Sequence, residues 1–366
     1  MIISYKYRIY PTKKQVDVIN HQFSLCRRLY NNALEHRITA YKSAGISISY
    51  KDQQNELPLL KGAFPEYKTI HSQVLQNVLR RLDNSFCHFF RRVGEGQTPG
   101  FPRFKGKDFF NSICYTQSGF ALVGNRVELS KIGEVKIKLH RKMEGKIKTC
   151  SIKRSGKQWY IIFTCEVIKI IDKRPIWSIT GIDLGLESFA TLSSGEKIDN
   201  PRYLKKNEEK LKDMQSVYSL KKSKNKKKKL VRLHKKVTNQ RNVFLHKMSR
   251  SLVNRFDLIA YEELDIRQMI PGRFAKSIQD AGWGKFIQII KYKAESAGTC
   301  AIGVNPRNTS QTCSHCGVAV KKEIHQRIHE CPGCGLSLHR DHNAAINILK
   351  SGTDAVFQMP RQLAAG

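Results

Sequence analysis

The first hundred residues combine one strand pattern with two long amphipathic patterns. Polar and apolar residues alternate through 4–10 ("SYKYRIY"), which predicts a short strand. Thr12 and Gln15 then have the T-x-x-Q spacing of a helix capping box. Apolar residues recur at helical spacing over 16–38 and again over 72–93. The pattern therefore predicts a strand followed by a helical block.

Residues 110–168 are rich in β-branched and aromatic side chains, which favours strands. Two such runs within this stretch are separated by Ser155-Gly156, which predicts a hairpin. Because one strand precedes the helices and several follow them, we predict a β-barrel with a helical block inserted into its first connection. We assign residues 1–10 and 97–172 to the barrel and 11–96 to the inserted helical domain.

A different pattern begins at Ile179. Two strand-like segments, "ITGIDLG" and "FATLS", and a short third one precede a helical region over 204–256. A strand ("DLIAYEEL"), a helix over 283–297, a strand ("TCAIGV") and a final helix from Asp341 follow. This β-β-β-α-β-α-β-α order is that of RNase H-like nucleases, so the predicted fold is a multidomain α+β protein. We assign 175–307 and 336–352 to the nuclease-like domain, 308–335 to an insertion and 353–366 to a C-terminal tail.

Three acidic residues lie where this order would bring them together. Asp183 is expected to end the first strand, Glu262 ends the fourth, and Asp341 opens the last helix. Clustered carboxylates repel one another, and a hard divalent cation such as Mg²⁺ relieves that repulsion. Two such ions promote phosphodiester hydrolysis. Each residue alone also has a structural explanation: Asp183 as a turn residue, Asp341 as an N-cap, and Glu262 or its neighbour Glu263 as a solvated charge.

Four cysteines form two C-x₂-C pairs separated by 14 residues: Cys313 with Cys316, and Cys331 with Cys334. Four thiolates at this spacing match a closed, structural zinc site, and each pair is followed by glycine. The alternatives are a reduced thiol cluster or a disulfide. Nearby histidines that could substitute as ligands are His315, His325 and His329. A zinc ribbon here would help to hold Asp341 in register with the other two acids.

The charge balance indicates a polyanionic partner. Lys and Arg number 65 against 30 Asp and Glu, which gives a formal net charge of +35. A generally adhesive, ribosome-associated protein is the less specific alternative. No apolar run is long enough to span a membrane, and the N-terminus lacks the apolar core of a signal peptide, so we expect a cytoplasmic protein. We expect exposed basic residues on the N-terminal helices: Arg27, Arg28, Arg37, Arg80, Arg81, Arg91 and Arg92.

The segments "GIDLGLESFATLSSG", "IAYEEL", "SQTCSHCG", "CPGCG" and "RDHNAAINIL" together resemble the TnpB (OrfB) family of bacterial insertion sequences. "YRIYPTKKQ", "CRRLYNNAL" and "GFPRFK" extend the resemblance to nearly the whole chain. It implies an RNA-guided DNA endonuclease related to type V CRISPR effectors, with a wedge barrel, a helical recognition domain and a RuvC-like nuclease carrying a zinc ribbon. It also implies Mg²⁺ at a triad of Asp183, Glu262 and Asp341, and Zn²⁺ at the four cysteines.

The implied partners are a guide RNA from the transposon end and double-stranded target DNA beside a short motif. Amide and hydroxyl groups can read base edges, and basic side chains can contact phosphates. The candidates are Tyr50, Gln54, Gln76 and Thr116 for the bases and Arg27, Arg28, Arg80, Arg81, Arg103 and Lys105 for the backbone. Ordinary surface roles remain open for each. The functional alternatives are a nuclease-inactive guided repressor, an accessory transposition factor, and a DNA-joining transposase.

Overall fold

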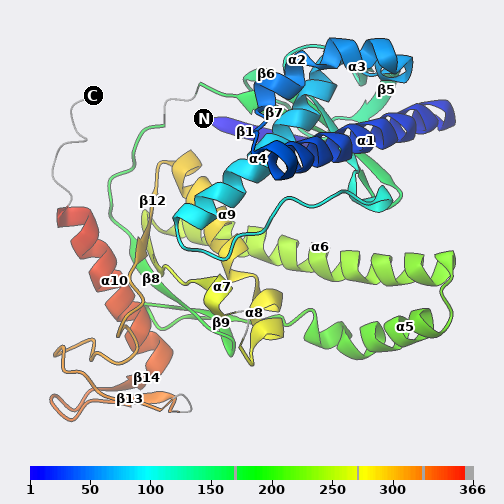
Figure 1. The fold of residues 1–366 in the computed structure, drawn as a ribbon. Helices are drawn as coiled ribbons and strands as arrows, with labels where there is room; N and C mark the ends of the chain where they lie inside the picture. The colour runs from blue at the N-terminus through cyan, green and yellow to red at the C-terminus, as the bar shows by residue number, and fades with distance from the viewer. Residues whose placement is uncertain (169–170, 270–271, 324–325, 359–366) are drawn as a thin grey trace. The chain divides into compact units, whose positions relative to one another are not determined.

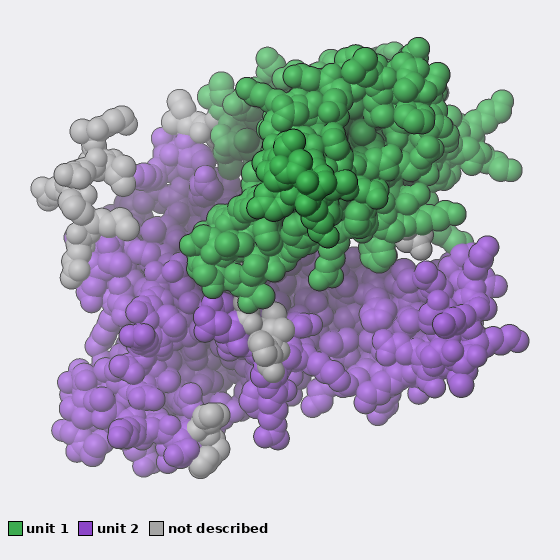
Figure 2. Space-filling model, in the orientation of Figure 1, with its two compact units in different colours: residues 1–169 green, residues 170–366 purple. Residues whose placement is uncertain are grey.

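The computed structural model describes residues 1–168, 171–269, 272–323 and 326–358 (Figure 1). The chain forms two compact units, Met1–Lys169 and Ile170–Gly366, which Figure 2 shows in separate colours. Each unit has its own buried apolar cluster. None of the described helices is both long and apolar enough to cross a bilayer.

A seven-stranded antiparallel sheet forms the base of unit 1. Its order is β2-β6-β7-β1-β5-β4-β3, so the N-terminal strand lies in the middle, between strands that follow the helices. The outermost strands, β2 and β3, are four residues apart in sequence, and the ring centroids of Tyr115 and Phe120 are 6.5 Å apart. The sheet therefore curls until its edges meet through side chains. The strands are β1 Ile2–Tyr10, β2 Ser112–Tyr115, β3 Phe120–Val123, β4 Arg126–Leu129, β5 Gly133–Lys138, β6 Lys146–Ser155 and β7 Gln158–Glu166.

The helices of unit 1 all lie between β1 and β2 in sequence, as predicted. The capping box at the start of α1 is confirmed, because Thr12 Oγ1 accepts from Gln15 N at 3.3 Å and Gln15 Oε1 accepts from Thr12 N at 3.0 Å. Helix α1 packs against α4, and α4 packs against β2. The helices are α1 Lys13–Ala44, α2 Tyr50–Asn55, α3 Leu57–Ala63 and α4 Ser72–Gly94, with a 3₁₀ turn over Pro65–Thr69.

Two arginines expected on the surface make contacts inside unit 1 instead. Arg37 is buried, donating from Nε to Gln53 Oε1 at 2.9 Å and from Nη1 to Asp83 Oδ1 at 3.2 Å. Arg81 donates from Nη1 to the Ser112 carbonyl at 2.8 Å, and burial lowers the pKa of its guanidinium. The expected exposure was therefore wrong for Arg37, and Arg81 is only half exposed, as are Arg27 and Arg92.

Unit 2 contains a five-stranded sheet of order β10-β9-β8-β11-β12. Strands β8, β11 and β12 run parallel, whereas β9 is antiparallel to both of its neighbours. The strands are β8 Ile179–Leu184, β9 Ser188–Leu192, β10 Lys197–Asp199, β11 Leu258–Glu262 and β12 Cys300–Val304. Leaving out the cysteine segment and the short helices before α9, the predicted β-β-β-α-β-α-β-α succession is confirmed.

The helices of unit 2 join and flank this sheet (Figure 1). The predicted helical region over 204–256 is two helices, which meet within the lysine run 221–229, and α9 ends at Ala297 with Gly298 as its C-cap. The helices are α5 Glu208–Leu220, α6 Lys224–Arg255, α7 Ile266–Met269, α8 Ala275–Ala281, α9 Trp283–Ala297 and α10 Arg340–Gln358, with a 3₁₀ turn over Lys205–Asn207.

The last helix is longer than expected. The prediction placed a tail from residue 353, but α10 continues to Gln358, and residues 359–366 lie outside the described part of the chain. Gly352 does not end the helix. A Cβ placed on it would lie 2.4 Å from Ala260 Cβ, so the glycine lets the helix approach β11 closely. Packing of α10 against the sheet therefore outweighs the low helix propensity of Gly352.

A carboxylate cluster beside a four-cysteine site

Strand pairing places Asp183 and Glu262 side by side. Ile182 on β8 pairs with Tyr261 on β11 in parallel register, so the next residue of each strand reaches the same level. Neighbouring strands are roughly 4.8 Å apart, and residues at the same level of a parallel pair point to the same face of the sheet. The two carboxylates thus share one face at the carboxyl end of the parallel strands.

Helix α10 brings the third carboxylate to this edge. The helix packs on β8 at Gly181, where a Cβ would lie 2.1 Å from the Ala345 carbonyl oxygen. Asp341 is in the first turn, and its Oδ2 is 4.0 Å from the position of a Cβ on Gly185, just after β8. Its carboxylate also lies 3.8 Å from His339 Nδ1. Close helix–sheet contact therefore places Asp341 beside the end of the strand that carries Asp183.

The pKa of Asp183 responds to both of the other carboxylates. The pKa of Asp183 is raised well above its usual range, first by burial and then by the charges of Glu262 and Asp341, against a smaller lowering effect of Arg340. Burial also raises the pKa of Glu262, which is 8% exposed. Its neighbour Glu263 is exposed and lies 3.8 Å from Lys291 Nζ, so Glu262 is the inward-facing member of the pair.

The carboxylates suit a hydrated hard cation. Among the described residues, the only group of three or more metal-ligating side chains with atoms all within 4.8 Å is the set of four cysteines, so at least one of the distances among the three acids is longer than this. Mg²⁺ prefers oxygen ligands and keeps several of its waters. Carboxylates that do not all touch one point could hold such an ion partly through its waters. Oxygen-only donors that repel one another therefore fit Mg²⁺ better than a soft metal.

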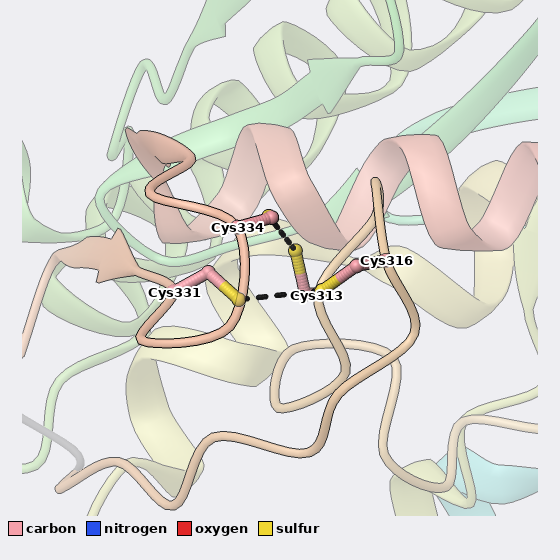
Figure 3. A group of neighbouring side chains, drawn as sticks. All are labelled: Cys313, Cys316, Cys331 and Cys334. Atoms are coloured by element: carbon pink, nitrogen blue, oxygen red, sulfur yellow. Dashed lines mark hydrogen bonds between the residues drawn. The ribbon is translucent and has the colours of Figure 1, made fainter.

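The four cysteines converge on one point between two loops (Figure 3). The Sγ atoms of Cys313 and Cys334 are 3.7 Å apart, and those of Cys316 and Cys331 are 3.4 Å apart. Sulfurs bound to one tetrahedral zinc at 2.3 Å would be about 3.8 Å apart. The short hairpin of β13 (Ile328–Glu330) and β14 (Ser337–His339) brackets the second pair. The arrangement is that of a zinc ribbon.

The histidines considered as substitute ligands are not part of this set. His329 is fully buried on β13 and His315 is exposed, and neither belongs to the group of converging atoms. His325 lies outside the described residues. The four-cysteine assignment therefore needs no histidine.

Three of the residues predicted to contact nucleic acid lie together on unit 1. Tyr50, Gln54 and Arg80 line a cavity of about 610 Å³ with Ser49, Lys51, Asn55 and Asp83. The Arg80 guanidinium lies 3.9 Å from the centroid of the Tyr50 ring, a cation–π contact. The cavity combines a stacked ring, an amide and a cation.

The other candidates are dispersed. Arg28 Nη1 is 2.9 Å from Glu66 Oε1, and Lys105 Nζ is 5.3 Å from the centroid of the Tyr30 ring. Arg103 is exposed, and Arg27 and Gln76 are half-buried. Arg81, as described, is engaged with Ser112.

Thr116 lies in a loop that is hydrogen-bonded to Gln73, a residue that the sequence analysis did not single out. Its hydroxyl is 3.5 Å from Gln73 Oε1, which also accepts from the backbone N–H groups of Gln117 and Ser118 at 2.9 and 2.8 Å. Gln73 therefore shapes this loop. Its role depends on a contact between distant parts of the chain, for which local spacing gives no signal.

Three protein-family models together match most of the chain. The family model described as "Helix-turn-helix domain" matches residues 1–45, that described as "Probable transposase" matches 163–271, and that described as "Cas12f1-like, TNB domain" matches 283–348. In this structure residues 1–45 contain β1 and the single long helix α1. The TNB match contains all four cysteines.

Two bacterial relatives align over nearly the full length. The "Putative RNA-guided DNA endonuclease" of Streptomyces pristinaespiralis is 32% identical over 370 residues, which cover 96% of this chain and 90% of the relative. The "Putative RNA-guided DNA endonuclease InsQ" of Escherichia coli (strain K12) is 29% identical over 375 residues, covering 95% and 92%.

Solved structures show the same fold. The "Cryo-EM structure of the Cas12f1-sgRNA-target DNA complex" contains a chain that matches with a TM-score of 0.59 at 16% identity, covering 92% of this chain and 83% of that one. The "Structure of the mini-RNA-guided endonuclease CRISPR-Cas_phi3" matches with a TM-score of 0.50 at 11% identity, covering 96% and 92%. With the full-length relatives and the matched models, these findings show that the chain belongs to the TnpB (OrfB) family.

Proposed function

We propose that this protein is an RNA-guided DNA endonuclease that cleaves double-stranded DNA beside a short motif, with Asp183, Glu262 and Asp341 as its catalytic residues. The observation that carries the proposal is the meeting of these carboxylates at one sheet edge, where Asp183 has a raised pKa. The fold and the names of the full-length relatives support it. In this assignment unit 2 is the RuvC-like nuclease with a zinc ribbon, and unit 1 comprises the wedge barrel and the recognition helices.

Each residue has a defined part in this chemistry. Asp183 and Glu262 come from adjacent strands and would hold a divalent cation from one face of the sheet, while Asp341 would hold it from the helix. Mg²⁺ bound there supplies charge stabilisation at the scissile phosphate and lowers the pKa of a bound water. Burial keeps the Glu262 carboxylate away from bulk solvent, which strengthens its attraction to a cation.

The net charge and the similar proteins support guide RNA and target DNA as the partners. A formal net charge of +35 fits a protein that encloses nucleic acid, and the solved Cas12f1 structure of the same fold is a complex with sgRNA and target DNA. We assign the guide RNA to a transcript of the transposon end. The cavity around Tyr50, Gln54 and Arg80 is the proposed reader of the motif beside the target.

The test begins with the RNA that copurifies with the full chain. Sequencing should reveal one enriched species with a constant part and a variable end. Rebuilding that end to match a plasmid that carries a randomised flank should give linear DNA in Mg²⁺, with one flanking motif enriched among cut molecules. A guide with a scrambled end is the matched control. Bound RNA without any cutting would favour the repressor, and joined DNA ends would favour a transposase.

A further inference from the structure

Thr309 is a buried polar residue whose side chain contacts one of the three carboxylates. It is 7% exposed, and its Oγ1 contacts Glu262 Oε1 and lies 3.1 Å from the Pro306 carbonyl oxygen. A hydroxyl has one proton to donate, and a carboxylate is the stronger acceptor. The hydroxyl therefore donates to Glu262 when that group is ionised, and it occupies one of the two carboxylate oxygens.

The loop that carries Thr309 has a defined shape. Asn308 adopts a left-handed conformation (φ 61°), which asparagine tolerates better than most residues. Its carbonyl oxygen accepts from the backbone N–H groups of Gln311 and Thr312 at 3.0 and 2.9 Å. The resulting turn is followed closely by Cys313, the first cysteine of the four-cysteine site. Thr309 is thus presented by the turn that leads into the ribbon.

The same loop is hydrogen-bonded to α10, the helix that carries Asp341. Asn347 Nδ2 donates to the carbonyl oxygens of Thr309 and Thr312 at 2.8 and 2.7 Å. Asn343, fully buried, donates from Nδ2 to the Thr312 carbonyl oxygen at 2.8 Å, and its Oδ1 accepts from Ser314 N at 2.8 Å. The two asparagines are four residues apart and share one helix face. Amides with several backbone partners, one of them fully buried, hold a loop in one position.

We propose that Thr309 is a positioning residue for the metal site, holding Glu262 in a fixed orientation relative to Asp341. One hydroxyl fixes Glu262 Oε1 and leaves Oε2 for the cation, while Asn343 and Asn347 tie the same loop to α10. The loop therefore connects three parts of unit 2: the ribbon, the strand of Glu262 and the helix of Asp341. This inference rests on the proposed function, because it assigns Glu262 to a cation.

The decisive comparison is Thr309→Val against Thr309→Ser in the full, zinc-loaded chain without nucleic acid. Valine keeps the shape but removes the hydroxyl, whereas serine retains it. Mn²⁺ serves as the probe in place of Mg²⁺, because unbound Mn²⁺ is measured directly by electron paramagnetic resonance. Loss of a hydrogen bond to a metal ligand typically weakens metal affinity 10- to 100-fold, so we expect at least a ~10-fold weaker Mn²⁺ affinity for Thr309→Val. Thr309→Ser should stay within about 3-fold of wild type.

Glu262→Gln distinguishes Mn²⁺ binding at this site from unspecific Mn²⁺ binding, because it removes the carboxylate that is proposed to bind the ion. If Thr309→Val binds Mn²⁺ as wild type does while Glu262→Gln is weakened, Thr309 has no positioning role. If Glu262→Gln also binds like wild type, Glu262 holds no cation and the inference is overturned. A purely packing role predicts a lower melting temperature with unchanged Mn²⁺ affinity, which would also overturn it.

Cleavage provides a second readout that separates this inference from the proposed function. Under guided cutting, Thr309→Val should raise the Mg²⁺ concentration for half-maximal rate about 10-fold, with partial recovery at saturating Mg²⁺. If wild-type protein binds Mn²⁺ through Glu262 yet cuts no DNA, the proposed function fails while the Thr309 comparison still stands on Mn²⁺ affinity.

Discussion

Replacing Asp183 by Asn should stabilise the metal-free protein. The side chain keeps its shape but loses a charge that burial and two neighbouring carboxylates disfavour. Its partner Glu262 is on the adjacent strand at the same level, so the charges are roughly 5 Å apart. At an effective dielectric constant of about 20, which allows for solvent at this partly exposed edge, the repulsion is about 3 kcal/mol. For a domain of this size that corresponds to a rise in melting temperature of about 6–12 °C.

The pH dependence of this effect has a definite sign. The folded pKa of Asp183 is raised, so the folded wild type binds more protons than the unfolded chain between the unfolded pKa of about 3.9 and the folded value. Wild-type stability therefore falls as pH rises through that window. The advantage of Asp183→Asn should be absent below it and complete above it, so the advantage should be smaller at pH 5 than at pH 8.

The assay is calorimetry in chelator-treated buffer that leaves zinc in place, with Asp199→Asn as the control. Asp199 is an exposed residue on β10 of the same sheet, so its amide variant tests the chemical change without the cluster. Added Mg²⁺ should raise the melting temperature of wild type but not of Asp183→Asn, because a ligand stabilises only the state that binds it. A melting temperature of Asp183→Asn equal to or below that of Asp199→Asn would refute the reasoning.

Three further predictions address the ribbon, the helix–sheet contact and the charge. Zinc analysis should find one ion per chain, and Cys331→Ser should lose it and lower the melting temperature of unit 2; an unchanged zinc content would contradict the ribbon. Gly181→Ala should destabilise the protein by about 2 kcal/mol or more, because its Cβ would collide with α10, whereas Gly62→Ala, with open space around it, should be neutral or stabilising in thermal melts. RNA binding measured from 50 to 200 mM salt should weaken about 10³-fold; a flat response would contradict the role of the basic surface.

The sequence supports predictions about the candidate site where residue spacing and element order determine the positions. Cys313 to Cys334 form a pattern that is nearly independent of the surrounding fold, and the cysteines converge as predicted. Asp183, Glu262 and Asp341 could be placed together because strand ends meet at one edge of a parallel sheet. The choice of Glu262 over Glu263 rested on alternation along the strand, and the structure has Glu262 buried and Glu263 exposed.

Features that depend on contacts between distant residues were not predictable from local patterns. Thr309 and Gln73 have polar side chains typical of loops, and only their partners reveal what they do. Arg37 and Arg81 look like surface cations, but tertiary packing turns them inward. Gly352 suggests a helix end by propensity, yet contact with Ala260 overrides that preference.

The most direct test of the catalytic claim is guided cleavage with target binding measured on the same samples. Wild type should linearise a matched plasmid in Mg²⁺, whereas Asp183→Ala, Glu262→Ala and Asp341→Ala should each cut at least ~10³-fold more slowly while holding guide RNA and target as tightly as wild type. Cutting that persists at the wild-type rate in any of the three variants would contradict the assignment of this carboxylate cluster as the nuclease site.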